Sequence, residues 1–379
     1  MKPALKVLIQ TRPGMGSRLT GDVTQVRKTA EALERQGVEV QFSDSLEPDT
    51  AGVDVVHLFS TLQPHYTYLR LKHLKARGVP TVVSTIYWEW EPAELKAESI
   101  FRLGRAGYCA SRLVNALRRN APNALRYRLE KPLRPYPMQA RFYDLERKVG
   151  ANAMRRYIYD NAGVLLPNSE TEYVYLAERF GTSNDYVAVP NAVDPQFGDG
   201  DRDAFHRRHG LSDFILCCAV VQIRKNQRHL IAAANALELP LVLVGSEEPR
   251  YGRLCRALAG PTVRFLGQLQ GAELQDAYAA ARTHALVSFY ETPGLASLEA
   301  AISGNTIVAT DRGSPREYFG AHAFYCQPTD VESIKTALSQ AFRAAPDPAL
   351  KARVLREYTW DKTAEATIEG YRCAIAKGG

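Results

Sequence analysis

The sequence alternates, over most of its length, between short apolar runs typical of buried strands and amphipathic stretches typical of helices. This alternation predicts parallel sheets with helices on both faces. The pattern runs through one series and restarts near residue 214, so a chain of 379 residues is expected to form two doubly wound α/β domains. The predicted strands are residues 6–10, 38–42, 53–59, 79–85, 163–167, 186–190, 214–221, 239–245, 262–266, 284–289 and 306–310.

The stretch Glu-Thr-Pro-Gly-Leu-Ala-Ser-Leu-Glu, residues 291–299, is the strongest indication of function. It follows an apolar run at 285–289 that is typical of a buried strand, and it leads into a short predicted helix that ends at Gly304. The mouth of a strand–loop–helix unit favours anions, because free amides and the positive end of the helix dipole point outward there. A carboxylate at each end can accept hydrogen bonds from hydroxyls. Amides for phosphate and carboxylates for hydroxyls fit a sugar nucleotide.

Composition excludes several other classes of protein. The six cysteines form no CxxC pair, which predicts reduced, buried thiols and no disulfide framework. No run approaches the ~20 apolar residues of a membrane span, and the apolar run at the start is too short for a signal peptide. We therefore expect a cytoplasmic globular protein whose core needs neither disulfides nor metals.

Several stretches, in this order, resemble retaining glycosyltransferases of the GT-B fold, family 4 type. Glu291 and Glu299 match the family's pair of glutamates eight positions apart. The resemblance implies two Rossmann-like domains that face a central cleft: residues 1–193 for the acceptor, residues 194–358 for the nucleotide sugar, and a helix at 359–379 that packs back on the first domain. The other matching stretches are residues 189–194, 224–227, 241–245, 265–267 and 303–310.

The resemblance also implies the roles of individual residues. Arg224 and Lys225 would neutralise the departing diphosphate, and Glu291 would contact the donor sugar near the reacting carbon. Glu299 would accept hydrogen bonds from the ribose hydroxyls. Gly21, in a glycine-containing first loop, would approach the donor phosphates. The backbone around four further positions would hold phosphate or sugar: Thr292, Gly294, Leu295 and Ala296.

The implied reaction transfers a sugar with retention at the anomeric carbon. The sequence places no second carboxylate as a nucleophile, unlike the retaining glycosidases. A same-face displacement, in which the departing phosphate takes the acceptor's proton, therefore fits better. No metal and no cofactor is expected, because Arg224 and Lys225 can carry the phosphate charge.

Two departures from the family pattern concern the cleft. The Gly-Arg that usually precedes the phosphate turn is absent, so Arg224 replaces one customary arginine or that arginine is missing. Tyr87 stands where the family has a histidine near the donor sugar, and it can still donate a hydrogen bond. His57 follows Asp54-Val55-Val56 at the end of the predicted strand 53–59. It either faces the cleft as an acceptor or sugar ligand, or it is satisfied locally within the domain.

The net charge of +7 is concentrated in one region. Residues 96–160 hold fifteen Lys and Arg against five acids, a net +10, with apolar residues near helical spacing between the arginines. A basic amphipathic helix is a candidate for an anionic membrane surface or a lipid pyrophosphate. The alternative is a solvated insertion with local ion pairs. Nucleic acid is not an expected partner, because no binding motif for it is present.

These observations predict a glycosyltransferase that moves a sugar from a nucleotide donor to a glycan or lipid-linked glycan, as in polysaccharide biosynthesis, at most peripherally attached to the membrane. A non-catalytic relative that binds glycans or lipid is the first alternative. A nucleotide-dependent oxidoreductase or epimerase is the second. It predicts NAD binding near residues 14–21, and the dinucleotide fingerprint is absent there.

Overall fold

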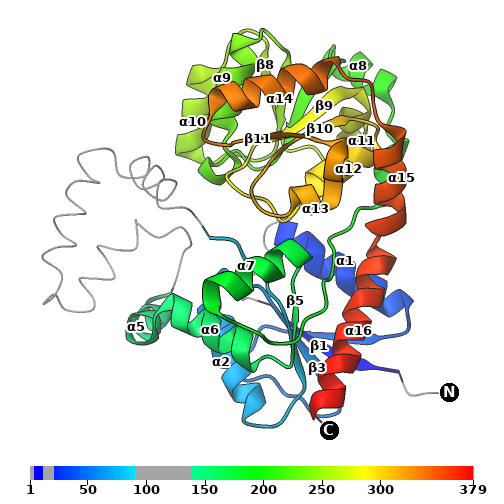
Figure 1. Cartoon of the computed structure of the whole chain (residues 1–379). Helices are drawn as coiled ribbons and strands as arrows, with labels where there is room; N and C mark the ends of the chain where they lie inside the picture. The colour runs from blue at the N-terminus through cyan, green and yellow to red at the C-terminus, as the bar shows by residue number, and fades with distance from the viewer. Residues whose placement is uncertain (1–3, 12–20, 90–138, 379) are drawn as a thin grey trace, which may run out of the picture.

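The computed structural model describes residues 4–11, 21–89 and 139–378, which form two α/β domains (Figure 1). The N-terminal sheet has five parallel strands in the order β2-β1-β3-β4-β5. The two doubly wound domains predicted from the alternation are thereby confirmed. The strands of this sheet are β1 (Lys6–Gln10), β2 (Glu39–Ser43), β3 (Val55–Phe59), β4 (Thr81–Ser84) and β5 (Val164–Leu166).

Helices cover both faces of the N-terminal sheet, and one core lies on each face. The core beneath α1 and α16 includes Val7, Ile9 and Tyr371, and the core on the opposite face includes Leu8, Ile158 and Leu176. Alternation along β1 thus sends successive side chains to opposite faces. The described helices here are α1 (Gly21–Arg35), α2 (Pro64–Lys75), α5 (Ala140–Val149), α6 (Ala151–Asn161), α7 (Glu170–Phe180) and α16 (Trp360–Gly378).

The C-terminal sheet has six parallel strands in the order β11-β10-β9-β6-β7-β8. Its inner strands are almost wholly apolar and buried, as expected for a sheet with helices on both faces. The strands are β6 (Phe214–Cys218), β7 (Leu241–Val244), β8 (Val263–Gly267), β9 (Ala281–Leu286), β10 (Thr306–Thr310) and β11 (Phe324–Cys326).

Five helices of this domain begin at a capping aspartate or at a proline. Asp201 caps α8, Asp330 caps α14 and Asp347 caps α15, each through its carboxylate. The α-helices are α8 (Arg202–His209), α9 (Gln227–Ala236), α10 (Pro249–Leu258), α11 (Gly271–Ala280), α12 (Leu295–Ile302), α13 (Pro315–Phe319), α14 (Val331–Arg343) and α15 (Pro348–Glu357). Three short 3₁₀ helices are η4 (Pro195–Asp199), η5 (Ile223–Lys225) and η6 (Gly320–His322).

One predicted strand, residues 186–190, is wrong as a regular element. The chain from Asp185 to Val189 runs beside β5 and makes three backbone hydrogen bonds, two with Leu165 and one with Pro167, but it forms only one bridge, between Leu165 and Tyr186. The ladder is broken at Pro167, which has no N–H to donate to the facing carbonyl. A proline in the partner strand therefore explains the difference.

A second predicted strand, residues 284–289, ends earlier than expected. Strand β9 stops at Leu286, where its pairing with β10 also stops. Beyond this point the Val287 carbonyl accepts from the Asn226 side chain, and the Phe289 N–H donates to the Arg224 carbonyl. The chain therefore leaves the sheet to pair with the turn that carries Arg224 and Lys225.

The end of the chain returns to the N-terminal domain. Figure 1 shows α15 on the C-terminal domain and α16 continuing down the N-terminal one. Helix α16 packs against α1, β4 and β5, and the short link before it pairs with residue 193 through a bridge between Val193 and Thr359. Helix α16 thus packs on the N-terminal domain, although it follows the C-terminal domain in the sequence.

Candidate functional site

The phosphate-binding turn predicted at Arg224 and Lys225 is the 3₁₀ helix η5, which follows β6 and leads into α9. Asn226 ends this turn in the left-handed conformation, with φ +59°, which asparagine adopts more readily than most residues. Its buried side-chain amide donates to the carbonyls of Val287 (3.0 Å) and Pro328 (2.7 Å). One asparagine thus holds the basic turn against the chain that follows β9.

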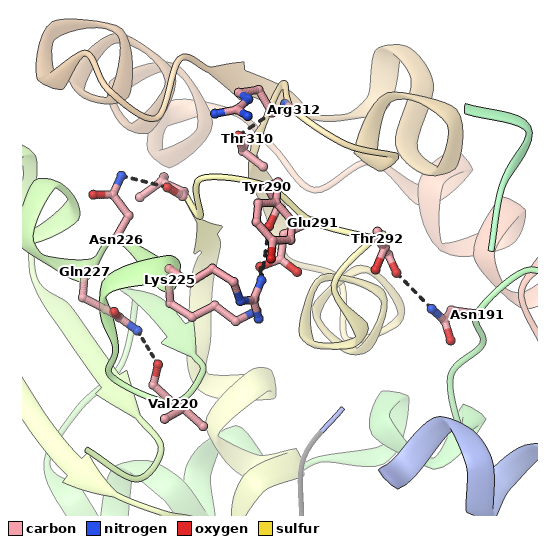
Figure 2. A network of polar contacts seen from close by, with 12 residues as sticks. Asn191, Val220, Lys225, Asn226, Gln227, Tyr290, Glu291, Thr292, Thr310 and Arg312 are labelled. Carbon is pink, nitrogen blue, oxygen red and sulfur yellow. Dashed lines mark hydrogen bonds and ion pairs between the residues drawn. The ribbon is translucent and has the colours of Figure 1, made fainter. Parts of the chain in front are cut away.

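The turn brings both cations to Glu291. Lys225 Nζ lies 2.5 Å and Arg224 Nη1 lies 3.5 Å from the same oxygen, Glu291 Oε1. The side chains of Lys225 and Glu291 are only 14% and 7% exposed, so the pair is largely shielded from water. Figure 2 shows Lys225 pointing at Glu291 from the facing segment. The structure therefore unites the three residues predicted to be catalytic.

Burial and charge oppose each other at this cluster. Burial raises the pKa of Glu291, but the charges of Lys225 and Arg224 outweigh it, and the pKa of the carboxyl lies below its ordinary value. Burial and the neighbouring Arg224 lower the pKa of Lys225, and Glu291 offsets part of this effect. We take Glu291 as ionised, since two cations surround one carboxylate. The Glu291 carboxylate thus pairs with two cations that could otherwise bind a diphosphate.

The backbone of Glu291 is held by the segment that follows β10. The Glu291 N–H donates to the Arg312 carbonyl (3.2 Å), and the Ser314 N–H donates to the Glu291 carbonyl (2.9 Å). Gly313, between these partners, has φ +95°, and a Cβ there would lie 1.9 Å from the Glu291 carbonyl oxygen. Only glycine allows this close approach.

The positions predicted to bind the donor come directly after Glu291 in the sequence and lead into α12. Gly294, with φ +94°, stands at the N-cap of α12, and no side chain caps that helix end. Leu295 and Ala296 are its first two residues, so their amides point out of the helix where an anion is favoured. The Thr292 carbonyl accepts a 2.9 Å hydrogen bond from the Asn191 side chain, which Figure 2 also shows.

Glu299 lies in the second turn of α12 and makes a 2.6 Å hydrogen bond with the Tyr278 hydroxyl, which donates to Oε2. Burial raises the pKa of Glu299 to about 7, although the Tyr278 hydrogen bond lowers it. A carboxyl poised near neutrality, with one oxygen held by a tyrosine, can still accept from hydroxyl groups. No measurement tests its predicted contact with ribose, which stays a prediction.

His57 is the third residue of β3 and pairs with both neighbouring strands, so its prediction as a strand-end residue is wrong, and it is engaged inside the N-terminal domain. Its Nδ1 lies 2.8 Å from the Tyr371 hydroxyl of α16, and its Nε2 lies 2.8 Å from Ser84 Oγ. The side chain is 1% exposed, and burial lowers its pKa to about 3. These contacts favour the local alternative over a role in sugar binding.

Tyr87 is also largely buried. Its ring lies beneath the Arg155 guanidinium (4.6 Å), and its N–H donates to the Glu172 carboxylate (2.8 Å). Burial raises the pKa of Tyr87 to about 12, so the hydroxyl stays protonated and able to donate. Its place near a donor sugar stays a prediction.

The remaining predictions fall partly outside the described residues. Gly21 is the first residue of α1, but the loop before it, which contains Gly14 and Gly16, is not described. Most of the basic region, residues 96–138, also lies outside. In its described part, Arg155 donates to the carbonyls of Thr61 and Leu62, and Arg156 donates to Phe180. Arginines here thus serve local packing.

Several residues that support the candidate site were not singled out from the sequence. Asn226 and Gly313 hold the backbone of the site, and Tyr278 holds Glu299. The left-handed preference of Asn after Arg-Lys could have signalled the first. Tyr278 carries no local signal, because its partner is 21 residues away.

Neither a membrane helix nor a metal cluster stands out in the described part of the chain. None of its helices is long and apolar enough to cross a bilayer. Across residues 4–11, 21–89 and 139–378, no three His, Cys, Asp or Glu side chains gather as a metal site.

The chain is similar to known glycosyltransferases in sequence and in fold. Residues 212–343, in the C-terminal domain, match the family described as Glycosyl transferases group 1. Among curated proteins it is 28% identical to O-antigen chain mannosyltransferase B of Escherichia coli, over 42% of this chain and 45% of that one. It is 30% identical to a D-inositol 3-phosphate glycosyltransferase of Stackebrandtia nassauensis, over 56% and 54%. The chain thus spans about half the length of these relatives.

Solved structures share the whole fold. Sucrose-phosphate synthase from Thermosynechococcus elongatus superimposes with a TM-score of 0.72 at 16% identity, covering 98% of this chain and 100% of that one. HepE from Anabaena, in complex with UDP, gives 0.65 at 13% identity, covering 96% and 99%. The GT-B fold predicted from the resemblance is therefore confirmed.

Proposed function

We propose that this chain is a retaining glycosyltransferase of family 4 type, which transfers a sugar from a nucleotide-sugar donor to a glycan or lipid-linked glycan. One observation carries the proposal: Lys225 and Arg224 both lie within 3.5 Å of Glu291 Oε1, beside the uncapped start of α12. Two cations and a helix N-terminus together suit a diphosphate. The likeness to a UDP complex and to sugar transferases supports the same conclusion.

In the proposed reaction, the bond between the anomeric carbon and the diphosphate oxygen breaks, and the nucleoside diphosphate leaves as an anion. Lys225 and Arg224 stabilise that developing charge. The acceptor hydroxyl oxygen bonds to the anomeric carbon on the same face, and its proton passes to the departing phosphate. Glu291 holds the donor sugar's hydroxyls, and Glu299 holds the ribose. Because two protein cations carry the phosphate charge, we expect transfer to continue in EDTA.

The donor can be identified without knowing the acceptor. Thermal shifts measured with UDP, GDP, dTDP and ADP select the nucleotide, and the matching sugar nucleotides are then tested for hydrolysis and transfer. We expect Glu291→Gln to abolish turnover, while Glu332→Gln, an exposed glutamate in α14, leaves it unchanged. NMR of the product reports the anomeric configuration.

Two results would contradict the proposal. Nucleotide binding without turnover of any sugar nucleotide supports the alternative of a non-catalytic glycan- or lipid-binding protein. A product with inverted configuration refutes the retaining mechanism.

For the basic region, salt-sensitive sedimentation with anionic vesicles is expected if it binds a membrane surface, and its absence refutes that role.

A further inference from the structure

The N-terminus of α7 is capped by residues from both domains. Ser169, at the N-cap, accepts the Glu172 N–H (2.9 Å), as is usual within one helix. The two amides before it, of Glu170 (3.0 Å) and Thr171 (2.8 Å), donate to the carboxylate of Glu317 in α13. The Thr171 hydroxyl donates to the same carboxylate (2.7 Å). An acid at a helix N-terminus is stabilised by free amides and by the dipole.

This cap is one of several contacts made by α13, which lies on the side of the C-terminal domain that faces the N-terminal domain (Figure 1). The hydroxyls of Ser169 and Ser314 lie 2.6 Å apart and are buried. The Tyr318 hydroxyl donates to the Asn168 carbonyl (2.5 Å) and accepts the Asn191 N–H (2.8 Å). A helix of only five residues thus docks on the loop between β5 and α7 through directional bonds.

The same short helix is tied to the proposed catalytic site. Ser314, the residue before α13, donates its N–H to the Glu291 carbonyl (2.9 Å). The Glu317 N–H in turn donates to the Ser314 carbonyl (3.0 Å). Only the Ser314 turn separates the carboxylate that caps α7 from the backbone of Glu291.

Helix α7 also holds the cleft-side loop after β4. Its buried Glu172 accepts from the Thr85 hydroxyl and the Tyr87 N–H, on either side of Ile86, which has φ +44°. A β-branched residue is rarely found in this conformation, so the loop needs such support. One turn later Tyr175 stacks on Trp88 (4.2 Å), and Trp88 packs against the C-terminal core. Helix α7 is therefore an element shared by both halves of the site.

We propose that Glu317 is a positioning residue: by capping α7 across the domain boundary, it fixes the Ser314 turn and with it the backbone of Glu291. This inference rests on the proposed function for its catalytic consequence, but its structural part does not. Loss of the cap releases α13 from the N-terminal domain and loosens the Glu291 loop, while the nucleotide site within the C-terminal domain keeps its residues.

The test is amide hydrogen exchange, resolved to single residues, in the full-length protein. For Glu317→Ala we expect exchange at least tenfold faster at four amides: Glu170 and Thr171, which lose their acceptor, and Glu291 and Ser314, which lose their support. Val308, in the buried strand β10, reports any general destabilisation and is expected to stay within twofold. Glu317→Gln keeps an acceptor oxygen without the charge. Its exchange rates at the four amides are expected to lie between those of the wild type and those of Glu317→Ala. Glu332→Ala, an exposed acid of the same domain, is the matched control.

Transfer assays add the catalytic consequence. We expect Glu317→Ala to lower kcat at least tenfold with the donor KM within threefold, and Glu317→Gln to recover part of the rate. If Glu170 and Thr171 alone exchange faster, the cap is real but does not position Glu291, and the proposal is wrong. Unchanged exchange at all four amides also overturns it. Faster exchange at all four in a protein that turns over no sugar nucleotide upholds the coupling and refutes only the proposed function. If the alanine variant does not fold, the glutamine variant carries the test.

Discussion

The raised pKa of Glu299 leads to a quantitative prediction, because the carboxyl holds its proton to a higher pH in the folded chain than in the unfolded chain. Its pKa is raised from 4.5 to about 7 by burial. Between these values the folded protein keeps a proton that the unfolded chain has released. Stability must therefore fall as pH rises through this window and level off above it. The difference is roughly 2.5 pKa units at about 1.4 kcal/mol each, or about 3 kcal/mol. We take this as an upper bound, since Glu299 keeps some contact with solvent.

The perturbation is Glu299→Gln, which mimics the protonated acid and cannot ionise. Relative to the wild type, the variant is expected to gain up to about 3 kcal/mol between pH 4.5 and 7.5. The measurement is urea denaturation followed by circular dichroism at several pH values, and the readout is the difference between the two proteins. The difference is needed because His57 and His284 are buried with a pKa of about 3, and they make stability rise with pH.

Two controls sharpen the result. Tyr278→Phe removes the hydrogen bond that lowers the pKa of Glu299, so the pH-dependent loss of stability should deepen. Glu332→Gln, at an exposed site, should leave the profile unchanged. A difference between wild type and Glu299→Gln that is flat from pH 4.5 to 7.5 would refute the reasoning, because it would mean that Glu299 is already solvated and ionised.

Two further predictions concern the cluster of Lys225, Arg224 and Glu291. Lys225→Met leaves Glu291 with Arg224 alone, so we expect the free energy of unfolding to fall by about 2–3 kcal/mol. A double-mutant cycle with Glu291→Gln measures the coupling energy of the pair. A coupling energy near zero would contradict the buried ion pair. Gly313→Ala should cost about 1–3 kcal/mol more than Gly304→Ala, because the added methyl group meets the Glu291 carbonyl, and it should abolish turnover. Both glycines have a positive φ, but a Cβ at Gly304 meets nothing, so equal effects would contradict the contact at Gly313.

The fold could be predicted because its signal is local. A run of apolar residues indicates each of the strands β1 and β10, and both were predicted with their observed bounds. The residues that form the cluster of Arg224, Lys225 and Glu291 could also be singled out, because they lie in continuous motifs between predicted strands and helices. Their roles, and that of Glu299, stay predictions. Where the pattern misled, the cause lay in another segment: Pro167 for residues 186–190, and the Arg224 turn for the end of β9.

The contacts between the domains could not be predicted, and the physical reason is sequence separation. The His57 ring is paired with Tyr371, 314 residues later, and Glu317 caps a helix that begins 147 residues earlier. The sequence gives no sign of a partner for His57, within β3, or for Glu317, in a short helix. Their partners follow only from how α16 and α13 pack, so a role in the cleft could be neither assigned nor excluded for them beforehand.

The same sequence separation explains why the contacts of α7 with Glu317 and Tyr87 could not be predicted. Its sequence shows an ordinary capping pattern, Ser169 followed three residues later by Glu172, in which the acid normally returns to the N-cap amide. Here the Glu172 carboxylate instead accepts from Tyr87 and Asn168, and the amides at the helix start go to Glu317. The local motif therefore forms the helix, while its acid and its free amides are used to join the loop after β4 to the other domain. A capping motif whose acid is fully buried, as Glu172 is, therefore indicates a long-range partner.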